Sequence, residues 1–165
     1  MERYLRSVLI AVALLLLQTT FIPYLSIAGY LPDIFLPWLI FVALRRGQIE
    51  STVSGFAVGL LQDIVATQFL GLAAFSKTLT GFIAGYFFHE NQVGQNLGTY
   101  RYVLLVMLGS VIHNLVYFLI FFQGTEGSVV LSTIQASAAT TLYTCVISVL
   151  PMFGFSQRYH TSWAQ

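Results

Sequence analysis

Six stretches of mostly apolar residues follow one another along the chain, separated by short breaks. They cover approximately residues 5–22, 27–44, 50–65, 69–88, 102–122 and 129–151. A helix needs about 20 apolar residues to cross a hydrocarbon core of about 30 Å. The apolar runs do not alternate with polar residues as the strands of a membrane barrel do. The pattern therefore predicts an all-α membrane protein, a single domain built as a bundle of six transmembrane helices.

The second stretch is less regular than the others. Pro23, Gly29, Pro32 and Pro37 interrupt its first half, and proline breaks a helix because it lacks an N–H donor. The uninterrupted part is too short for a full crossing. We expect part of this span to be a half-helix or an extended entry.

Composition agrees with a membrane location and excludes one class of partner. The chain of 165 residues is 57% hydrophobic and 8% charged, whereas soluble domains carry about 25% charged residues. Its net charge of +1 gives no basis for nucleic-acid binding. The single cysteine, Cys145, cannot form a disulfide within the chain.

The arginines predict the orientation in the membrane. With six spans, all of them fall on one side, and the opposite connections contain no Lys or Arg. Positive residues favour the cytoplasmic side, so both termini should lie in the cytoplasm. The arginines are Arg3, Arg6, Arg45, Arg46, Arg101 and Arg158.

Two charged residues lie inside predicted spans, where charges are costly and often functional. Asp63 is near the outer end of the third span, and Lys77 is about two turns into the fourth. Because these spans form a hairpin, we expect the two residues to lie at similar depth and to pair. Such a pair is either a structural salt bridge or a buried polar site that contacts a partner or ligand.

Asp33 follows Pro32 at the expected start of the second helix. An aspartate there accepts hydrogen bonds from free N–H groups and faces the positive end of the helix dipole. A capping role and a binding role are both compatible with this position.

Small and polar residues form stripes on several spans, which usually indicates close helix packing. Gly-Phe-x-x-Gly occurs twice, with glycines at Gly55, Gly59, Gly81 and Gly85. The fifth span carries a stripe of Gly109, Ser110, His113, Asn114 and Tyr117, and the sixth carries Ser137, Thr140, Thr141, Thr144 and Ser148. The alternative is a polar internal cavity lined by the last two stripes, with His113 as its most reactive group.

Patterns typical of catalysis or metal binding are absent from the sequence. The three histidines, His89, His113 and His160, are not at ligand spacing on one helix. We therefore expect no enzymatic activity, no cofactor and no metal.

Three blocks in series resemble the bacterial rod shape-determining MreD family. The first runs from Pro32-Asp33-Ile34-Phe35-Leu36 to Ala43-Leu44-Arg45-Arg46-Gly47. The second is Gly55-Phe56-Ala57-Val58-Gly59-Leu60-Leu61-Gln62-Asp63. The third begins at Gly71-Leu72, contains Ala74-Phe75-Ser76-Lys77-Thr78-Leu79, and ends with Gly81-Phe82 and Ala84-Gly85. The blocks cover roughly residues 32–85, and the remaining spans match only in hydropathy.

The resemblance implies a multi-pass protein of the bacterial cytoplasmic membrane that serves as a scaffold of the cell-elongation complex. It would bind MreC, a single-span protein with a periplasmic domain, and support lateral peptidoglycan synthesis. Through MreC it would connect to MreB filaments, a SEDS glycosyltransferase and a class B penicillin-binding protein. The candidate structural or partner-binding residues are Pro32, Asp33, Arg45, Arg46, Gly55, Gly59, Gln62, Asp63, Lys77, Gly81, Gly85, His113 and Asn114. Whether the chain forms a homodimer stays open.

The family is also thought to share its fold with the substrate-binding subunits of energy-coupling-factor transporters. This relation supplies an alternative function, a vitamin-type small-molecule binding subunit that uses a cavity between helices. A vitamin binder should concentrate aromatic and hydrogen-bonding residues near the outer end of the bundle. The outer connections here are short and contain few polar residues, which favours the scaffold.

Overall fold

A computed structural model describes residues 2–27, 29–66, 69–89, 93, 97, 99–123 and 128–160. Within this part of the chain, all regular secondary structure is helical apart from one isolated bridge between Ile27 and Tyr30. The elements are α1 (Glu2–Thr20), the 3-10 helix η1 (Ile22–Leu25), α2 (Phe35–Arg46), α3 (Gln48–Ala66), α4 (Leu72–Gly85), α6 (Tyr100–Phe121) and α7 (Val129–His160).

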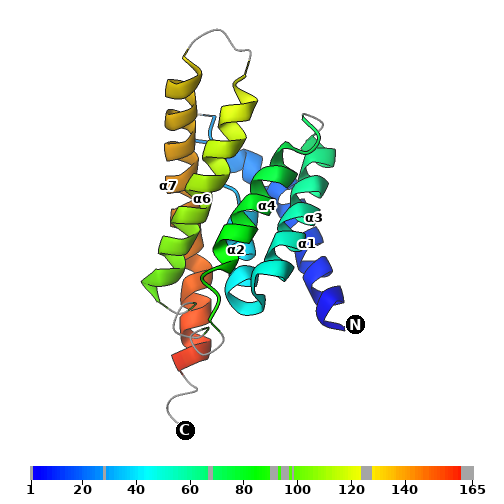
Figure 1. Ribbon diagram of the computed structural model, residues 1–165. Helices are drawn as coiled ribbons and strands as arrows, with labels where there is room; N and C mark the ends of the chain where they lie inside the picture. Colours follow the sequence, from blue (N-terminus) through cyan, green and yellow to red (C-terminus); the bar gives the residue numbers. More distant parts are fainter. Residues whose placement is uncertain are drawn as a thin grey trace.

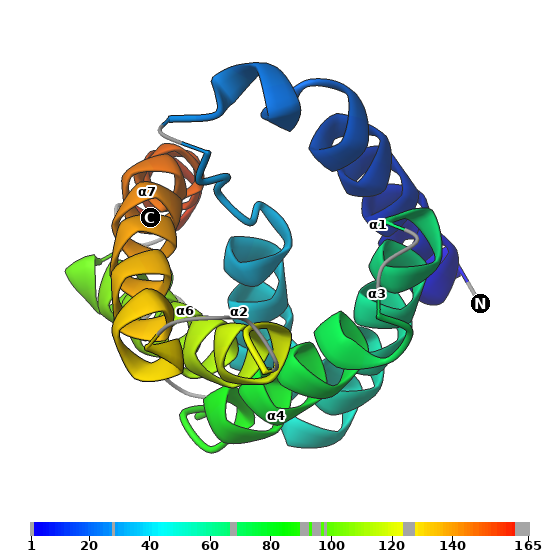
Figure 2. The ribbon, with the colours of Figure 1, turned by 90° about the horizontal axis from the view of Figure 1, so that it is seen from above.

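The short helix α2 lies at the centre, and the longer helices surround it (Figure 2). Going round the bundle, α1 lies beside α3, α3 beside α4, α4 beside α6 and α6 beside α7. The N-terminus, the turn between α2 and α3, and the C-terminal end of α7 lie at one end of the bundle (Figure 1). The arginines at the end of α2 and the start of α6 therefore lie at the same end as both termini.

The irregular second stretch consists of an extended segment followed by a half-helix, as its prolines and glycine predict. After η1 the chain runs inward, and α2 begins only at Phe35. With 12 residues, α2 is about 18 Å long, too short to cross a membrane alone. It ends at Gly47, whose φ of 85° lies in a region that other residues rarely adopt. Segment and half-helix together carry the chain from one end of the bundle to the other.

The described residues contain six α-helices, one in each predicted span, but several helix lengths differ from the predicted spans. Among the described residues, three helical stretches are long and apolar enough to cross a membrane: Gln48–Ala66, Tyr100–Phe121 and Val129–Gly154. The fourth predicted span, 69–88, contains only the 14 residues of α4, about 21 Å. The last predicted span ends at Pro151, whereas the helix α7 continues through this proline to His160.

The interior forms two apolar clusters on opposite sides of α2. One joins α2 to α4 and α6 around Ile40, Leu44 and Tyr102, and the other joins α1, α2 and α3 through Ala11, Phe35 and Val58. The outward faces of α1, α3, α6 and α7 carry exposed leucines, valines, isoleucines and phenylalanines. An apolar outer face is what a helix bundle presents to lipid.

Candidate functional site

The extended segment before α2 depends on hydrogen bonds from side chains of two other helices. Gln18 of α1 donates to the carbonyl oxygen of Pro32 at 3.0 Å and accepts from the N–H of Ile34 at 3.1 Å. The hydroxyl of Thr144 in α7 accepts from the N–H of Asp33 at 3.1 Å. Non-helical backbone at membrane depth is tolerated only where protein satisfies its polar groups. Gln18 and Thr144 supply the hydrogen-bond partners of the backbone groups in this segment.

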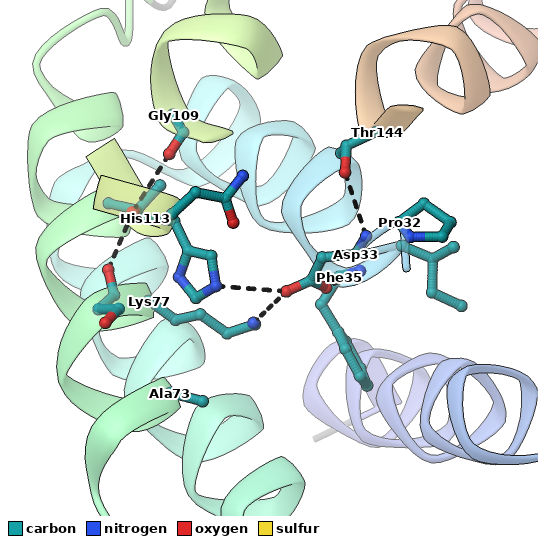
Figure 3. A network of polar contacts seen from close by, with 12 residues as sticks. Pro32, Asp33, Phe35, Ala73, Lys77, Gly109, His113 and Thr144 are labelled. Atoms are coloured by element: carbon teal, nitrogen blue, oxygen red, sulfur yellow. Dashed lines mark hydrogen bonds and ion pairs between the residues drawn. The ribbon is translucent and has the colours of Figure 1, made fainter. Parts of the chain in front are cut away.

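Asp33 stands at the point where this segment enters α2, and its two carboxylate oxygens have different partners. Oδ1 accepts a hydrogen bond of 2.9 Å from the N–H of Phe35, in the first turn of the helix. Oδ2 accepts from Nζ of Lys77 in α4 and lies 3.6 Å from Nε2 of His113 in α6 (Figure 3). Asp33 thus accepts a hydrogen bond from an N–H at the start of α2, as expected of a cap, although the N-cap residue of the helix is Ile34. One residue thereby connects three elements.

All three members of this polar centre are buried. Lys77 is 0% exposed, His113 4% and Asp33 7%. The Lys77 ammonium also lies 5.9 Å from the centre of the Phe35 ring, a cation–π distance. A buried charge without a partner is strongly destabilising. The arrangement therefore fixes the positions of α2, α4 and α6 relative to one another.

The prediction that Asp63 pairs with Lys77 is wrong. Asp63 accepts hydrogen bonds from the N–H groups of Gly71 at 2.9 Å, Ala73 at 3.0 Å and Ala74 at 3.0 Å. These groups belong to the start of α4, so the carboxylate caps that helix and meets the positive end of its dipole. The cap of α4 thus comes from the end of the neighbouring helix α3.

The register of the hairpin explains the error. Gly55 of α3 packs against the backbone of Lys77, and Gly59 packs against Ala73 and Ala74. Lys77 is therefore level with Gly55, eight residues along α3 from Asp63, which corresponds to about 12 Å. The two residues therefore lie at different depths, and the assumption of equal depth was wrong.

The four glycines of the repeated pattern all lie between α3 and α4. A Cβ on Gly55 would lie 2.5 Å from the carbonyl oxygen of Lys77, and one on Gly81 would lie 2.5 Å from that of Ser51. Gly59 and Gly85 are as closely enclosed, by Ala73, Ala74 and Gln48. Across the same contact, the Ser51 hydroxyl donates to the carbonyl oxygen of Gly81 at 2.8 Å. These glycines hold the hairpin together and leave no room for a partner helix.

The small and hydroxyl stripes of α6 and α7 face inward. Asn114 donates to the hydroxyl of Thr141 at 3.0 Å and links the two helices. Gly109 lies against Ile40 of α2 and Thr80 of α4. Several buried polar atoms on these stripes have no hydrogen-bond partner in the structure, namely Ser110 Oγ, His113 Nδ1, Thr133 Oγ1 and Ser137 Oγ. The stripes therefore combine close packing with unused hydrogen-bonding capacity.

The remaining candidates lie apart from the polar centre. The Gln62 side-chain oxygen is buried and has no hydrogen-bond partner. Arg46 forms an ion pair of 3.4 Å with Glu50 across the turn between α2 and α3. Arg45 is exposed, and its guanidinium lies 5.7 Å from the centre of the Phe41 ring. No group of three or more His, Cys, Asp or Glu in the described part of the chain is placed to hold a metal ion.

Two contributors were missed from the sequence. Gln18 appears there only as a polar residue at the end of an apolar run, and Tyr102 as the start of a span. Gln18 holds the extended segment, and the Tyr102 hydroxyl donates to the carbonyl oxygen of Pro37 at 2.8 Å. That carbonyl lies within the first turns of α2. A polar residue that interrupts an apolar run next to a proline-rich stretch is a signal that could have identified Gln18.

Comparison with known proteins gives one clear match. The model of the family described as rod shape-determining protein MreD matches residues 1–159, nearly the whole chain. No curated protein and no solved structure matches the chain, so the expected likeness to energy-coupling-factor subunits gains no support. The match extends the resemblance seen in residues 32–85 to the first and last two spans. The chain belongs to the rod shape-determining protein MreD family.

Proposed function

We propose that this protein is a scaffold subunit of the rod-shape complex in the bacterial cytoplasmic membrane, that it binds MreC, and that it supports lateral peptidoglycan synthesis through this contact. Membership of the MreD family places the chain in rod-shape determination. Through MreC, the protein would connect indirectly to MreB filaments, a SEDS glycosyltransferase and a class B penicillin-binding protein. The end of the bundle with both termini and the arginines would face the cytoplasm.

The observation that carries the proposal is that polar contacts lie in the interior of the bundle, whereas its lateral faces are apolar. In the interior, polar contacts of four side chains hold helices to one another, namely those of Asp33, Lys77, Asp63 and Asn114. The lateral faces are apolar. This division supports a protein that acts through the contacts of its surface.

The internal role of the glycines supports a contact with MreC on the outer faces of the bundle. Because Gly55, Gly59, Gly81 and Gly85 are enclosed within the α3–α4 hairpin, a partner helix must use the outer faces. Helix association in lipid depends on packing and interhelical hydrogen bonds rather than on the hydrophobic effect. The contact would therefore be broad and shape-dependent.

Photo-crosslinking in a rod-shaped host tests direct binding. A crosslinking amino acid is placed, one position at a time, on an exposed site of each outer helix and on a buried control. MreC should be captured from one contiguous group of outer helices and not from the control. The exposed sites are Leu9, Phe56, Phe82, Leu104 and Leu142, and the control is Ile40.

Depletion of the protein tests the cellular role. Depleted cells should become round, and the wild-type chain should restore rods. If the protein inserts normally but no outer face gives a crosslink to MreC, direct binding is refuted. The role in rod-shape determination would not be contradicted by that result. Cells that keep their shape but lose uptake of a vitamin would replace the scaffold by the transporter alternative.

A further inference from the structure

Four buried side chains on two neighbouring helices each have a polar atom without a hydrogen-bond partner in the described part of the chain. They are Ser110 and His113 on α6, and Thr133 and Ser137 on α7. Ser110 is 0% exposed, and each of the other three is 4% exposed. Buried polar groups in proteins are normally paired, either within the chain or with bound water. The one other such atom in this part of the chain belongs to Gln62 on α3, so the unpaired groups are concentrated on α6 and α7.

The Lys77 ammonium, at the polar centre beside His113, also has unused hydrogen-bonding capacity. An ammonium carries three N–H donors and no acceptor, and Lys77 is completely buried. Among the described residues, it donates a hydrogen bond only to Asp33 (Figure 3). The Phe35 ring adds a cation–π contact at 5.9 Å but no hydrogen-bond acceptor. Two donors of a buried charge are therefore left without acceptors.

The unpaired groups follow the contact between α6 and α7. The hydrogen bond from Asn114 to Thr141 fixes how these helices lie against each other. On α6, His113 directly precedes Asn114. On α7, Ser137 and Thr133 lie one and two turns from Thr141 toward the start of the helix, so Thr133 is about 12 Å from Thr141. The start of α7 is at the end of the bundle opposite both termini (Figure 1). The unpaired groups thus extend from the polar centre toward that end.

Burial determines which kind of molecule can pair with these groups. A lipid headgroup or a side chain of another protein cannot reach atoms that the chain itself encloses. The Lys77 ammonium needs acceptors, whereas a hydroxyl group both donates and accepts. Water is small enough and does both. Buried water molecules in proteins typically form about three hydrogen bonds with polar groups of this kind.

We propose that water molecules are bound inside the bundle between α6 and α7, from Lys77 and His113 to Ser137 and Thr133. This water completes the hydrogen bonds of a charged centre within a membrane bundle, where charges are costly. It also allows the Lys77 ammonium to exchange protons with the aqueous phase at the end of the bundle opposite the termini. The inference concerns the interior and does not depend on the proposed contact with MreC.

Proton exchange at Lys77 provides the test. Lys77 is the only lysine of the chain, so isotope labelling at lysine Nζ gives a single NMR signal from the unmodified protein. The full-length protein in nanodiscs is moved into heavy water, and the Nζ signal is followed together with the backbone N–H of Lys77. That N–H lies within α4 and reports opening of the helix. The ammonium should exchange many-fold faster than the backbone N–H. Exchange of both groups at the same rate would overturn the proposal, because water would then enter only when the bundle opens.

Variants of α7 test the path of the water. Thr133→Val combined with Ser137→Ala removes two hydroxyls from the path and should slow exchange of the ammonium several-fold. Thr133→Val alone keeps the side-chain volume, and it should slow exchange in the same direction if the double variant unfolds.

Two controls remove hydroxyls that already have partners. Ser148→Ala changes a buried residue nearer the other end of α7, and Thr52→Val changes a residue of α3; each hydroxyl donates to a carbonyl oxygen of its own helix. Both controls should leave the exchange rate unchanged. If the α7 variants exchange as fast as the parent protein, or if Ser148→Ala slows exchange equally, water reaches Lys77 by another route and the proposal is wrong.

Discussion

The ion pair between Asp33 and Lys77 joins the end of an extended segment to the middle of α4 at the centre of the bundle. The connection brings together two residues 44 positions apart in the sequence. One carboxylate oxygen caps α2 while the other neutralises the lysine. The same residue thus ends an irregular segment and compensates a charge that would otherwise be buried alone.

Removing either charge should destabilise the bundle strongly. Asp33→Asn and Lys77→Met should each cost about 3–5 kcal/mol, because each leaves the other charge buried without its partner. The double variant should cost much less than the sum, which thermal unfolding in detergent measures. As a control, Asp63→Ala and Lys77→Met should be additive, since the two residues do not interact. Additive effects for Asp33 and Lys77 would contradict the pairing.

Loss of the Asp63 carboxylate should loosen the start of α4. Asp63→Ala leaves three N–H groups without their acceptor, and loss of a cap costs about 0.5–2 kcal/mol. Hydrogen exchange should rise at Gly71, Ala73 and Ala74, with little change in α7. Uniform exchange along the chain would indicate global rather than local opening.

Bulky substitutions at the hairpin glycines should prevent the two helices from packing. Gly55→Leu and Gly59→Leu place side chains into the backbone of α4, and overpacking costs about 1–3 kcal/mol or more. Gly154→Leu is the matched control, because no atom of another helix in the described part of the chain would lie within 4 Å of a Cβ at this position. The first two variants should unfold at lower temperature and the control should not. Equal effects at all three positions would mean that helix propensity alone accounts for them.

The extended segment should depend on Gln18. Gln18→Leu removes both hydrogen bonds to this segment, and each buried group left without a partner costs about 1–3 kcal/mol. Cysteines introduced in the segment should then react faster with thiol reagents in a Cys145→Ser background. Gln123→Leu is the control, because Gln123 bonds only within its own helix end. Unchanged reactivity would show that other contacts hold the segment.

Thiol labelling checks the proposed orientation. In the Cys145→Ser background, Ile49→Cys places a thiol at the arginine-bearing end, and Gln123→Cys places one at the opposite end; both positions are exposed. An impermeant reagent added to intact cells should label only the cysteine at position 123. Labelling at position 49 would invert the topology.

The sequence by itself determined the class of the protein and the position of most helices. Long apolar runs in α1, α3, α6 and α7 exceed what a soluble fold needs, so hydropathy locates them. Prolines forbid a regular helix before Phe35, and the sequence therefore also anticipated the half-helix. The cap at Asp33 follows from local geometry alone, because Phe35 is two residues away.

Only the tertiary structure decided which charges meet and which faces are used. Hydropathy gives the depth of a residue in the membrane only roughly. Lys77 is level with Gly55, eight residues along α3 from Asp63, and the sequence therefore assigned it the wrong partner. The pattern also showed that the glycines allow close approach, but not to which helix. These choices depend on the register of α3 against α4 and on the path of residues 29–34. Both are fixed by contacts between residues distant in sequence, which no local pattern encodes.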